Sequence, residues 1–356
     1  MENIKKAFHA KCEADSKGSK HISVVTTAEI WEKLKPMYDL LFTKVYEIET
    51  VLDEDPGSTC AKGECHIQDV PPDTEMPITE SLISEFLRQV PGKGKVSPML
   101  SSVIPDVFYH GFSTRSGGLS QFPSLSSLNL NFNPNRRDPR VVVQENRSRL
   151  AAACGFDVEK LHIAKAEHGA RVWVVGKHPP AAYDAIVTNI PGVTIAAPGA
   201  DCTPMLFADP VNQAVGAAHS GWRGTLAGVA AETLRAMAEN FGTVPSDVLV
   251  ALGPSIGPCC FEVGEDVAEK FAAVQPACVV REEGKEKPRV DLRKVTRLLL
   301  EQAGVKPGNI DDGTLGTEAT VTLCTVCEPE QRFFSYRRDG VQYGTQVGFI
   351  GIKTGE

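Results

Sequence analysis

Short apolar runs rich in β-branched residues, separated by loops, occupy the chain from about residue 107 onward. Runs of this length favour β-strands, and segments with the helical spacing of apolar residues follow mostly later. The predicted strands span residues 107–112, 162–166, 171–175, 194–197, 205–207, 214–218 and 248–252, and the predicted helices 139–153, 225–240, 265–273 and 292–303. This order predicts an α+β fold, in which mixed β-sheets are flanked by helices.

The first hundred residues form a different kind of sequence. Residues 21–25 predict a strand, and apolar residues at helical spacing from Ile30 to Val45 predict a long helix that Pro36 should kink or split. From residue 53 to about 96 the chain is acidic and rich in proline, which is typical of a linker. We therefore predict a small N-terminal α/β extension with its linker over residues 1–100 and a catalytic domain over 101–356.

The overall charge restricts the class of partner. The formal net charge of −8 argues against a nucleic-acid-binding protein, which needs a basic face. No apolar run is long enough to span a bilayer, and no hydrophobic stretch follows the basic residues at the start. We expect a cytoplasmic protein without a transmembrane segment; nuclear localisation and peripheral association with an organelle stay open.

Three residues lie where predicted strands end. His168 follows the run that starts at residue 162, Cys202 lies between two predicted strands, and His219 ends the run 214–218. Loop side chains at strand ends converge on sites that the sheet holds rigid. Two histidines and one cysteine form a known catalytic zinc set, which leaves a fourth position for water and lowers the pKa of that water. Spacing alone leaves the alternative open that these residues are structural.

Six ordered motifs resemble those of the laccase-domain, or purine nucleoside phosphorylase-like, family, and in particular its animal members with an N-terminal extension. The motifs are YHGFSTRSGGLS at 109–120, SLNLN at 127–131, GADCTP at 199–204, AHSGWRG at 218–224, GPSIG at 253–257, and Cys324 with FFSYRRDG at 333–340. The resemblance covers residues 106–356. The motifs do not extend to residues 1–100, and we expect this extension to bind a protein partner.

The resemblance implies one Zn²⁺ ion per chain, held by His168, Cys202 and His219; copper is the second candidate. It also implies phosphorolysis of adenosine, inosine, guanosine and 5′-methylthioadenosine, together with deamination of adenosine to inosine. One departure stands beside the first ligand. Where many members read Gln-Val-His-Gly, this chain has Glu167 before His168, which affects substrate preference more than metal binding.

Other candidate residues follow from the same chemistry. Arg115, in a glycine-containing turn, is the first candidate for binding phosphate, and Arg223 is the second. Asn129, with Asn131, either binds the ribose or shapes a turn. The acids Asp201 and Glu167 either orient a ligand or shuttle a proton. The aromatic residues of the last motif (Phe333, Phe334 and Tyr336) either stack on a base or belong to the core.

Two alternative functions stay open. A metal-independent hydrolase would use Cys202 with His219, and a non-catalytic scaffold would carry a relict site. A serine hydrolase at GPSIG is excluded because no histidine follows His219. Cys324 and Cys327 have the spacing of half a zinc site or of a redox pair; without an evident partner pair we interpret them as structural. Cys60, Cys65 and His66 are interpreted as inert.

Overall fold

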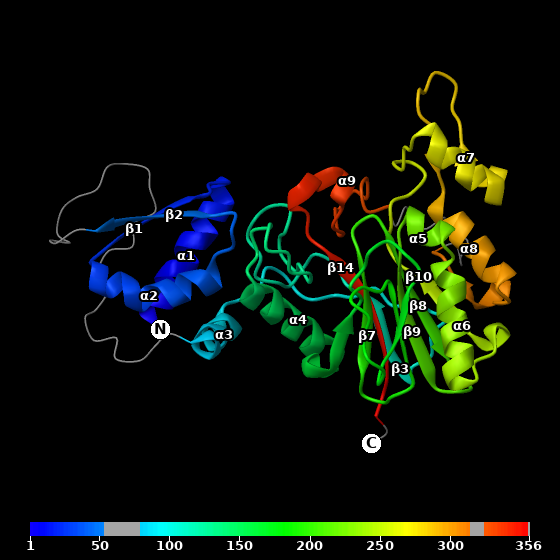
Figure 1. Cartoon of the computed structure of the whole chain (residues 1–356), viewed down its shortest axis with the longest axis horizontal. Helices are drawn as coiled ribbons and strands as arrows, with labels where there is room; N and C mark the ends of the chain where they lie inside the picture. Colours follow the sequence, from blue (N-terminus) through cyan, green and yellow to red (C-terminus); the bar gives the residue numbers. More distant parts are fainter. Residues whose placement is uncertain (53–78, 314–323, 355–356) are drawn as a thin grey trace. The chain divides into compact units, whose positions relative to one another are not determined.

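The computed structural model describes residues 1–52, 79–313 and 324–354, and within them the chain divides into two units (Figure 1). The N-terminal unit contains Met1–Val96 and Arg115–Arg149, and the C-terminal unit contains Ser97–Thr114 and Leu150–Glu356. Residues 115–149 thus group with the N-terminal part, although they follow the predicted boundary near residue 100. The division into a 1–100 extension and a 101–356 catalytic domain stays a prediction.

The N-terminal unit contains helix α1 (Glu2–Lys17), strand β1 (His21–Thr26), helix α2 (Ala28–Leu41), strand β2 (Glu47–Leu52) and helix α3 (Glu80–Gln89). β1 and β2 pair in parallel, and α2 supplies the crossover connection that a parallel pair needs. The Thr27 hydroxyl accepts a hydrogen bond from the amide of Ile30 and so caps α2. The helix continues through Pro36 without being split and ends before Val45.

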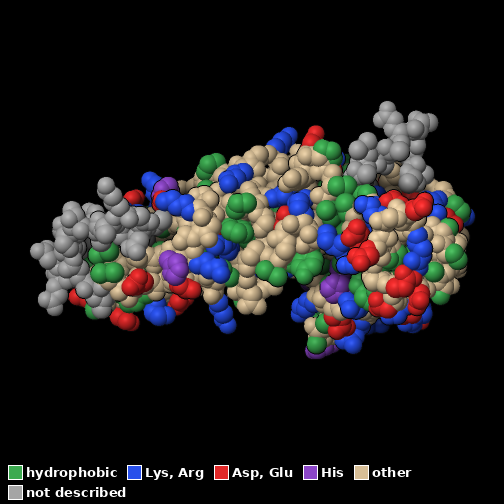
Figure 2. All heavy atoms as spheres, turned by 90° about the horizontal axis from the view of Figure 1, so that it is seen from above, with side chains coloured by type: hydrophobic (Ala, Val, Ile, Leu, Met, Phe, Trp, Pro, Cys, Tyr) green, Lys and Arg blue, Asp and Glu red, His purple; other side chains and the backbone are tan. Residues whose placement is uncertain are grey.

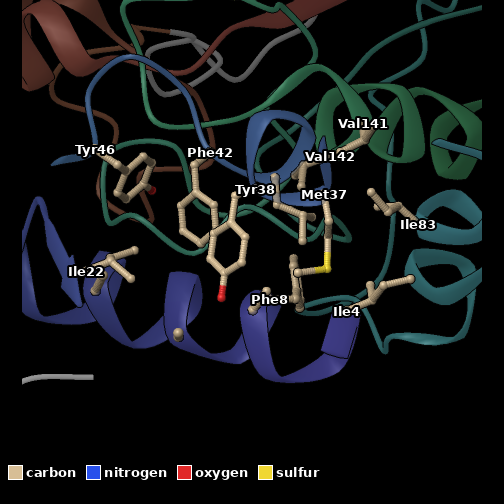
Figure 3. Packing of buried hydrophobic residues seen from close by; sticks show 14 of the residues in the cluster. Ile4, Phe8, Ile22, Met37, Tyr38, Phe42, Tyr46, Ile83, Val141 and Val142 are labelled. Atoms are coloured by element: carbon tan, nitrogen blue, oxygen red, sulfur yellow. The ribbon is translucent and has the colours of Figure 1, made fainter. Parts of the chain in front are cut away.

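A shared core joins these elements to residues 119–142 of the same unit. Tyr38 and Phe42 stack in its centre, and Val141 and Val142 from α4 (Arg140–Cys154) contact the same cluster (Figure 3). Leu119 is also buried in it. The continuity of this apolar cluster explains why residues 115–149 belong to the N-terminal unit.

Two helices of this unit were absent from the sequence prediction. The buried face of α1 includes Lys11 and Asp15, which form an ion pair with an Nζ–Oδ2 distance of 2.6 Å and interrupt its apolar pattern. α3 lies inside the segment that we interpreted as linker, yet Ile83 and Leu87 are fully buried. The linker interpretation is therefore wrong for residues 80–89; Cys60, Cys65 and His66 lie outside the described residues.

Two mixed sheets dominate the C-terminal unit. The six-stranded sheet has the order β13 (Ile310–Asp311), β10 (Leu249–Leu252), β8 (Thr203–Asp209), β9 (Ala214–Ser220), β6 (Ala185–Thr188), β5 (Val172–Val174). The four-stranded sheet has the order β3 (Phe108–Phe112), β14 (Gln346–Ile352), β7 (Thr194–Gly199), β4 (Leu161–Ile163). Parallel and antiparallel pairs occur in both sheets, so the predicted α+β fold is confirmed.

The six-stranded sheet is buried on both faces. Met205 and Phe207 of β8 contact the helix side, whereas Leu206 and Ala208 contact the four-stranded sheet, because successive side chains of a strand point to opposite faces. Helices α6 (Val229–Phe241) and α8 (Leu292–Gln302) cover the first face (Figure 1). This burial explains the nearly continuous apolar runs, and it makes β8 and β9 a rigid base for loop residues at their ends.

The remaining elements lie around this base. They are α5 (Trp222–Leu226), α7 (Glu265–Val274), the pair β11 (Val279–Val280) and β12 (Arg289–Val290), and α9 (Tyr336–Asp339). The single helix predicted over 225–240 is two helices, since Gly228 has a φ of 80° and interrupts the turn between α5 and α6. β4 is shorter than predicted, and β6 and β14 were missed.

The surface carries both signs of charge. On the face shown in Figure 2, Lys and Arg side chains are interspersed with Asp and Glu side chains. Among the residues that the structure describes, every helix is too short or too polar to cross a bilayer.

Candidate metal centre

The three predicted ligands meet at one end of β8 and β9, two central strands of the six-stranded sheet. Cys202 lies in the turn between β7 and β8, and His219 lies in β9, one residue before the strand ends. The antiparallel register pairs Pro204 with His219, which brings the turn of Cys202 beside the end of β9. His168 comes from the loop between β4 and β5, five residues after β4 ends and not at a strand end as predicted.

The geometry of the three side chains fits a single metal ion. One donor atom from each of His168, Cys202 and His219 lies within 4.8 Å of the other two. The imidazole rings of the two histidines are 4.9 Å apart at their centroids and nearly perpendicular. His219 is buried, Cys202 is half-buried and His168 is exposed. The site is thus anchored in the protein on one side and open to solvent at His168.

A fourth residue, Asp184, holds two of these ligands in place. One carboxylate oxygen, Oδ1, accepts hydrogen bonds from Nδ1 of His219 at 2.8 Å and from the amide of His168 at 2.9 Å. The other, Oδ2, accepts from the amides of Glu167 at 3.3 Å and Gly169 at 2.8 Å. His168 has a positive φ of 65°, a conformation uncommon outside glycine that these hydrogen bonds support.

Sequence reasoning missed Asp184. The signal available was an acidic residue directly before the short apolar run 185–188, which is β6. Because that run was not predicted as a strand, the acid at its start was not recognised as lying at a strand end.

The electrostatics of the site favour the charged forms of Cys202, His219 and Asp184. Burial raises the pKa of Cys202, but the imidazoles of His219 and His168 outweigh it and lower this pKa to about 6. Burial lowers the pKa of His219, but the Cys202 sulfur and the Asp184 carboxylate outweigh it and raise this pKa to about 9. Burial likewise opposes ionisation of Asp184, yet hydrogen bonds from His219 and from the loop amides keep its pKa below the usual value.

The same contacts make the site suitable for a metal. Because Asp184 occupies Nδ1 of His219, Nε2 of that ring is left to face Cys202, and a carboxylate behind a histidine is the usual support of a metal ligand. Gly221 keeps the space open: a Cβ there would lie 2.8 Å from Cys202 Sγ and 2.9 Å from His168 Cδ2. A nitrogen–nitrogen–sulfur set of this kind suits Zn²⁺ and also accommodates copper.

The other predicted acids make different contacts. Asp201 has a φ of 88°, and its carboxylate accepts hydrogen bonds from the Thr325 hydroxyl and from the Arg337 amide, both at 2.6 Å. The Glu167 side chain is exposed, and its carboxylate lies 3.8 Å from the Arg171 guanidinium. Their predicted roles beside a metal stay predictions, whereas Asp184 contacts His168 and His219 directly.

The residues predicted to bind phosphate and ribose lie in both units. Arg115, in the N-terminal unit, donates hydrogen bonds to the carbonyls of Ser126 and Pro123. Asn129, in the same unit, is buried and donates to the Asp138 carboxylate, while its oxygen accepts from the amide of Asn131. These contacts support the turn-shaping interpretation of Asn129; its ribose role stays a prediction.

Arg223 and the aromatic residues belong to the C-terminal unit. The exposed guanidinium of Arg223 stacks on Trp222, 4.2 Å from the ring centroid. Phe333 and Phe334 are fully buried, as the core interpretation expects, whereas Tyr336 is exposed and contacts the ring of Tyr343. Tyr336 is thus the member of the aromatic motif that remains accessible to a ligand.

The mixed α+β fold and the cluster of His168, Cys202 and His219 are those expected of a laccase-domain protein, and the comparisons with known proteins show the same family. Residues 109–353 match the sequence model of the family described as multi-copper polyphenol oxidoreductase laccase. The chain therefore belongs to this laccase-domain family, and the resemblance seen in the motifs is confirmed.

Particular relatives are similar over long stretches. Human purine nucleoside phosphorylase LACC1 is 46% identical over 351 residues, which are 97% of this chain and 79% of that protein. The purine nucleoside phosphorylase of Deinococcus radiodurans is 40% identical over 246 residues, 68% of this chain and 88% of that protein. The crystal structure of YlmD from Geobacillus stearothermophilus is similar with a TM-score of 0.61 and 32% identity, and covers 71% of this chain and 94% of that chain.

Proposed function

We propose that this chain is a zinc-dependent purine nucleoside phosphorylase. The substrates are adenosine, inosine, guanosine and 5′-methylthioadenosine, each cleaved by phosphate to the base and the ribose (or methylthioribose) 1-phosphate. The chain also deaminates adenosine to inosine. The names of its relatives support the phosphorylase reaction. The observation that carries the metal dependence is the set of His168, Cys202 and His219, two of which Asp184 orients.

Within this site each residue has a defined task. A bound zinc ion supplies Lewis-acid activation of water. Asp184 fixes the tautomer of His219, so that one ring nitrogen always faces the ligand position. Cys202 contributes a thiolate. The loop of His168 remains exposed, which gives a nucleoside access to the donor set.

Deamination also needs a group that moves a proton to the leaving amine. Glu167 is the better candidate, because its carboxylate is exposed beside His168. The carboxylate of Asp201 is engaged by Thr325 and Arg337 instead. For phosphorolysis, Arg115 is the first proposed phosphate ligand and Arg223 the second, since a guanidinium binds phosphate with two parallel hydrogen bonds.

Product analysis tests this function. The purified protein of known zinc content is incubated with adenosine, with and without phosphate, and the products are separated by chromatography. We expect inosine in both buffers, and adenine with ribose 1-phosphate only when phosphate is present. His219→Ala should lose zinc and both activities. Full turnover by that variant would contradict the zinc mechanism.

A second candidate function rests on the lowered pKa of Cys202 beside His219, the arrangement of a metal-independent thiol hydrolase. Removal of zinc by a chelator separates the two functions. Phosphorolysis and deamination should cease on chelation and return with Zn²⁺, whereas a thiol hydrolase would remain active. If neither reaction occurs with zinc bound, the scaffold interpretation of the chain is favoured.

A further inference from the structure

A second group of metal-binding side chains lies in the C-terminal unit, apart from the three ligands of the candidate metal centre. Cys259 and Cys260 are consecutive in the turn that follows β10, and Cys324 and Cys327 lie in the segment before α9. The four Sγ atoms all lie within 4.8 Å of one another, and those of Cys259 and Cys327 are 3.4 Å apart. The structure thus supplies the partner pair that the sequence did not reveal.

The backbone around Cys324 is arranged to receive a thiolate. Its buried sulfur accepts a hydrogen bond from the amide of Gly257 at 3.3 Å; burial raises the pKa of this thiol, but the backbone amides of Cys327, Gly257 and Val326 outweigh burial and lower it. Hydrogen bonds from backbone amides to sulfur favour the charged form. The turn is closed by a bond from the Glu328 amide to the Cys324 carbonyl at 3.1 Å. The amide of Gly257 and the closed turn 324–328 thus hold the first cysteine of the pair in place.

Positive charge surrounds the cluster. Arg289 donates to the Cys259 carbonyl and Arg337 to the Cys260 carbonyl, both at 3.1 Å. Arg293 donates to the hydroxyl of Ser255, whose backbone pairs with Cys324. Four thiolates around a divalent cation carry a net negative charge, which nearby guanidinium groups stabilise.

We propose that Cys259, Cys260, Cys324 and Cys327 bind a second metal ion, a thiophilic divalent cation with Zn²⁺ as the preferred one. A zinc ion about 2.3 Å from each of four sulfurs separates them by about 3.8 Å in a tetrahedron, a spacing that the cluster approaches. Binding releases the thiol protons to solvent. Because all four ligands come from the protein, the site is closed and structural.

This site fixes the segment that contacts the candidate metal centre. Thr325 lies between the two ligands Cys324 and Cys327, and its hydroxyl donates to Asp201, the neighbour of Cys202. The metal joins two turns that are more than sixty residues apart in the sequence. It therefore holds residues 324–327 against Asp201, and it contributes to the stability of the folded chain.

Zinc content of the full-length protein tests the proposal. Wild type should contain one zinc equivalent more than Cys327→Ser and one more than Cys202→Ser, and the variant with both changes should contain none. Cys154→Ser is the matched control, because Cys154 is a partly buried free cysteine outside both clusters, and it should keep the wild-type content. Cys259→Ser should lose the same zinc equivalent as Cys327→Ser. Both cysteines are exposed.

Substitution of zinc by Co²⁺ gives a readout that does not depend on activity. A four-sulfur cobalt site has strong sulfur-to-metal charge-transfer absorption, which should persist in Cys202→Ser and be lost in Cys327→Ser. The proposal is overturned if wild type holds a single zinc that Cys202→Ser removes. It is equally overturned if mass spectrometry without reductant shows the four cysteines paired as disulfides, or if an alkylating agent modifies all four in the zinc-loaded protein. If wild type showed no phosphorolysis, its content of the second zinc would be unaffected. The proposed function and the proposed second zinc site can therefore fail separately.

Discussion

At the scale of single residues, the carboxylate of Asp184 accepts four hydrogen bonds. Three come from the consecutive backbone amides of residues 167–169 and one from the ring of His219. A buried carboxylate with this many donors is satisfied only while the loop keeps its shape. The Asp184 carboxylate therefore positions two proposed ligands, His219 through its ring and His168 through its backbone amide. Its contribution to the proposed metal site is indirect, and it can be measured apart from that of the proposed ligands themselves.

Asp184→Asn should weaken zinc binding. The amide nitrogen replaces one of the two acceptor oxygens and faces N–H donors, so either the amides of Glu167 and Gly169 or the His219 ring and the His168 amide lose their acceptor. We expect zinc affinity about 10–100-fold lower, measured by competition with a chromophoric chelator. Asp209→Asn is the control: this buried acid also accepts backbone amides, from Val211 and Asn212, but contacts neither histidine. Equal zinc affinities in both variants would contradict the role given to Asp184.

Zinc affinity should depend on pH in a defined direction. In the metal-free chain the pKa of Cys202 is about 6 and that of His219 about 9, so between these values the thiol is ionised and the imidazole is protonated. Zinc displaces the His219 proton, and affinity should rise about tenfold per pH unit from about 6 to about 9. Below that range Cys202 must also lose a proton, and the slope should steepen. A chelator competition that gives the same affinity throughout this range would refute the prediction.

At the scale of elements, strands were easier to predict than the helices of the N-terminal unit. β7, β8 and β9 are buried on both faces, so small and apolar residues fill most positions and the runs stand out. α3 has only two buried residues in ten and follows a proline-rich stretch. Its role as part of the core is visible only once the cluster around Tyr38 is assembled.

Leu87→Ala should destabilise the protein if α3 is part of that core. Its side chain is fully buried, and its removal should lower the free energy of unfolding by about 2–5 kcal/mol. Urea denaturation measures the change. Glu85→Ala, an exposed position of the same helix, should leave stability nearly unchanged. A stability unaltered by Leu87→Ala would contradict the contribution of α3 to that core.

At the scale of the whole molecule, the N-terminal unit is built from two separate stretches of chain. Arg137 donates to the Asp15 carboxylate and to the carbonyls of Gly18 and Ser19, where α1 ends. These hydrogen bonds, of which the one to Asp15 is buried, join residues more than a hundred positions apart. Residues 115–149 therefore depend on the first hundred residues for both their charge partners and their apolar contacts.

A chain that starts at Ser101 tests the predicted domain boundary. It lacks the partners of Leu119, Val141 and Val142, and it leaves Arg137 without Asp15. We expect a protein that aggregates and binds a hydrophobic dye, as measured by light scattering and fluorescence. A monodisperse chain 101–356 that holds zinc would instead support the boundary at residue 100.

The sequence by itself determined the family and the long apolar strands β7, β8 and β9 of the C-terminal unit, and it predicted the three candidate ligand residues. It did so because apolar runs are local and because histidine and cysteine carry their chemistry in the side chain. Only the tertiary structure decided which groups support that site: Asp184 lies 35 residues before His219, and the pair at Cys259 meets the pair at Cys324. β14 likewise lies between β3 and β7, far from both in the sequence. Contacts of this kind depend on sheet register and chain reversal, which no local pattern of residues specifies.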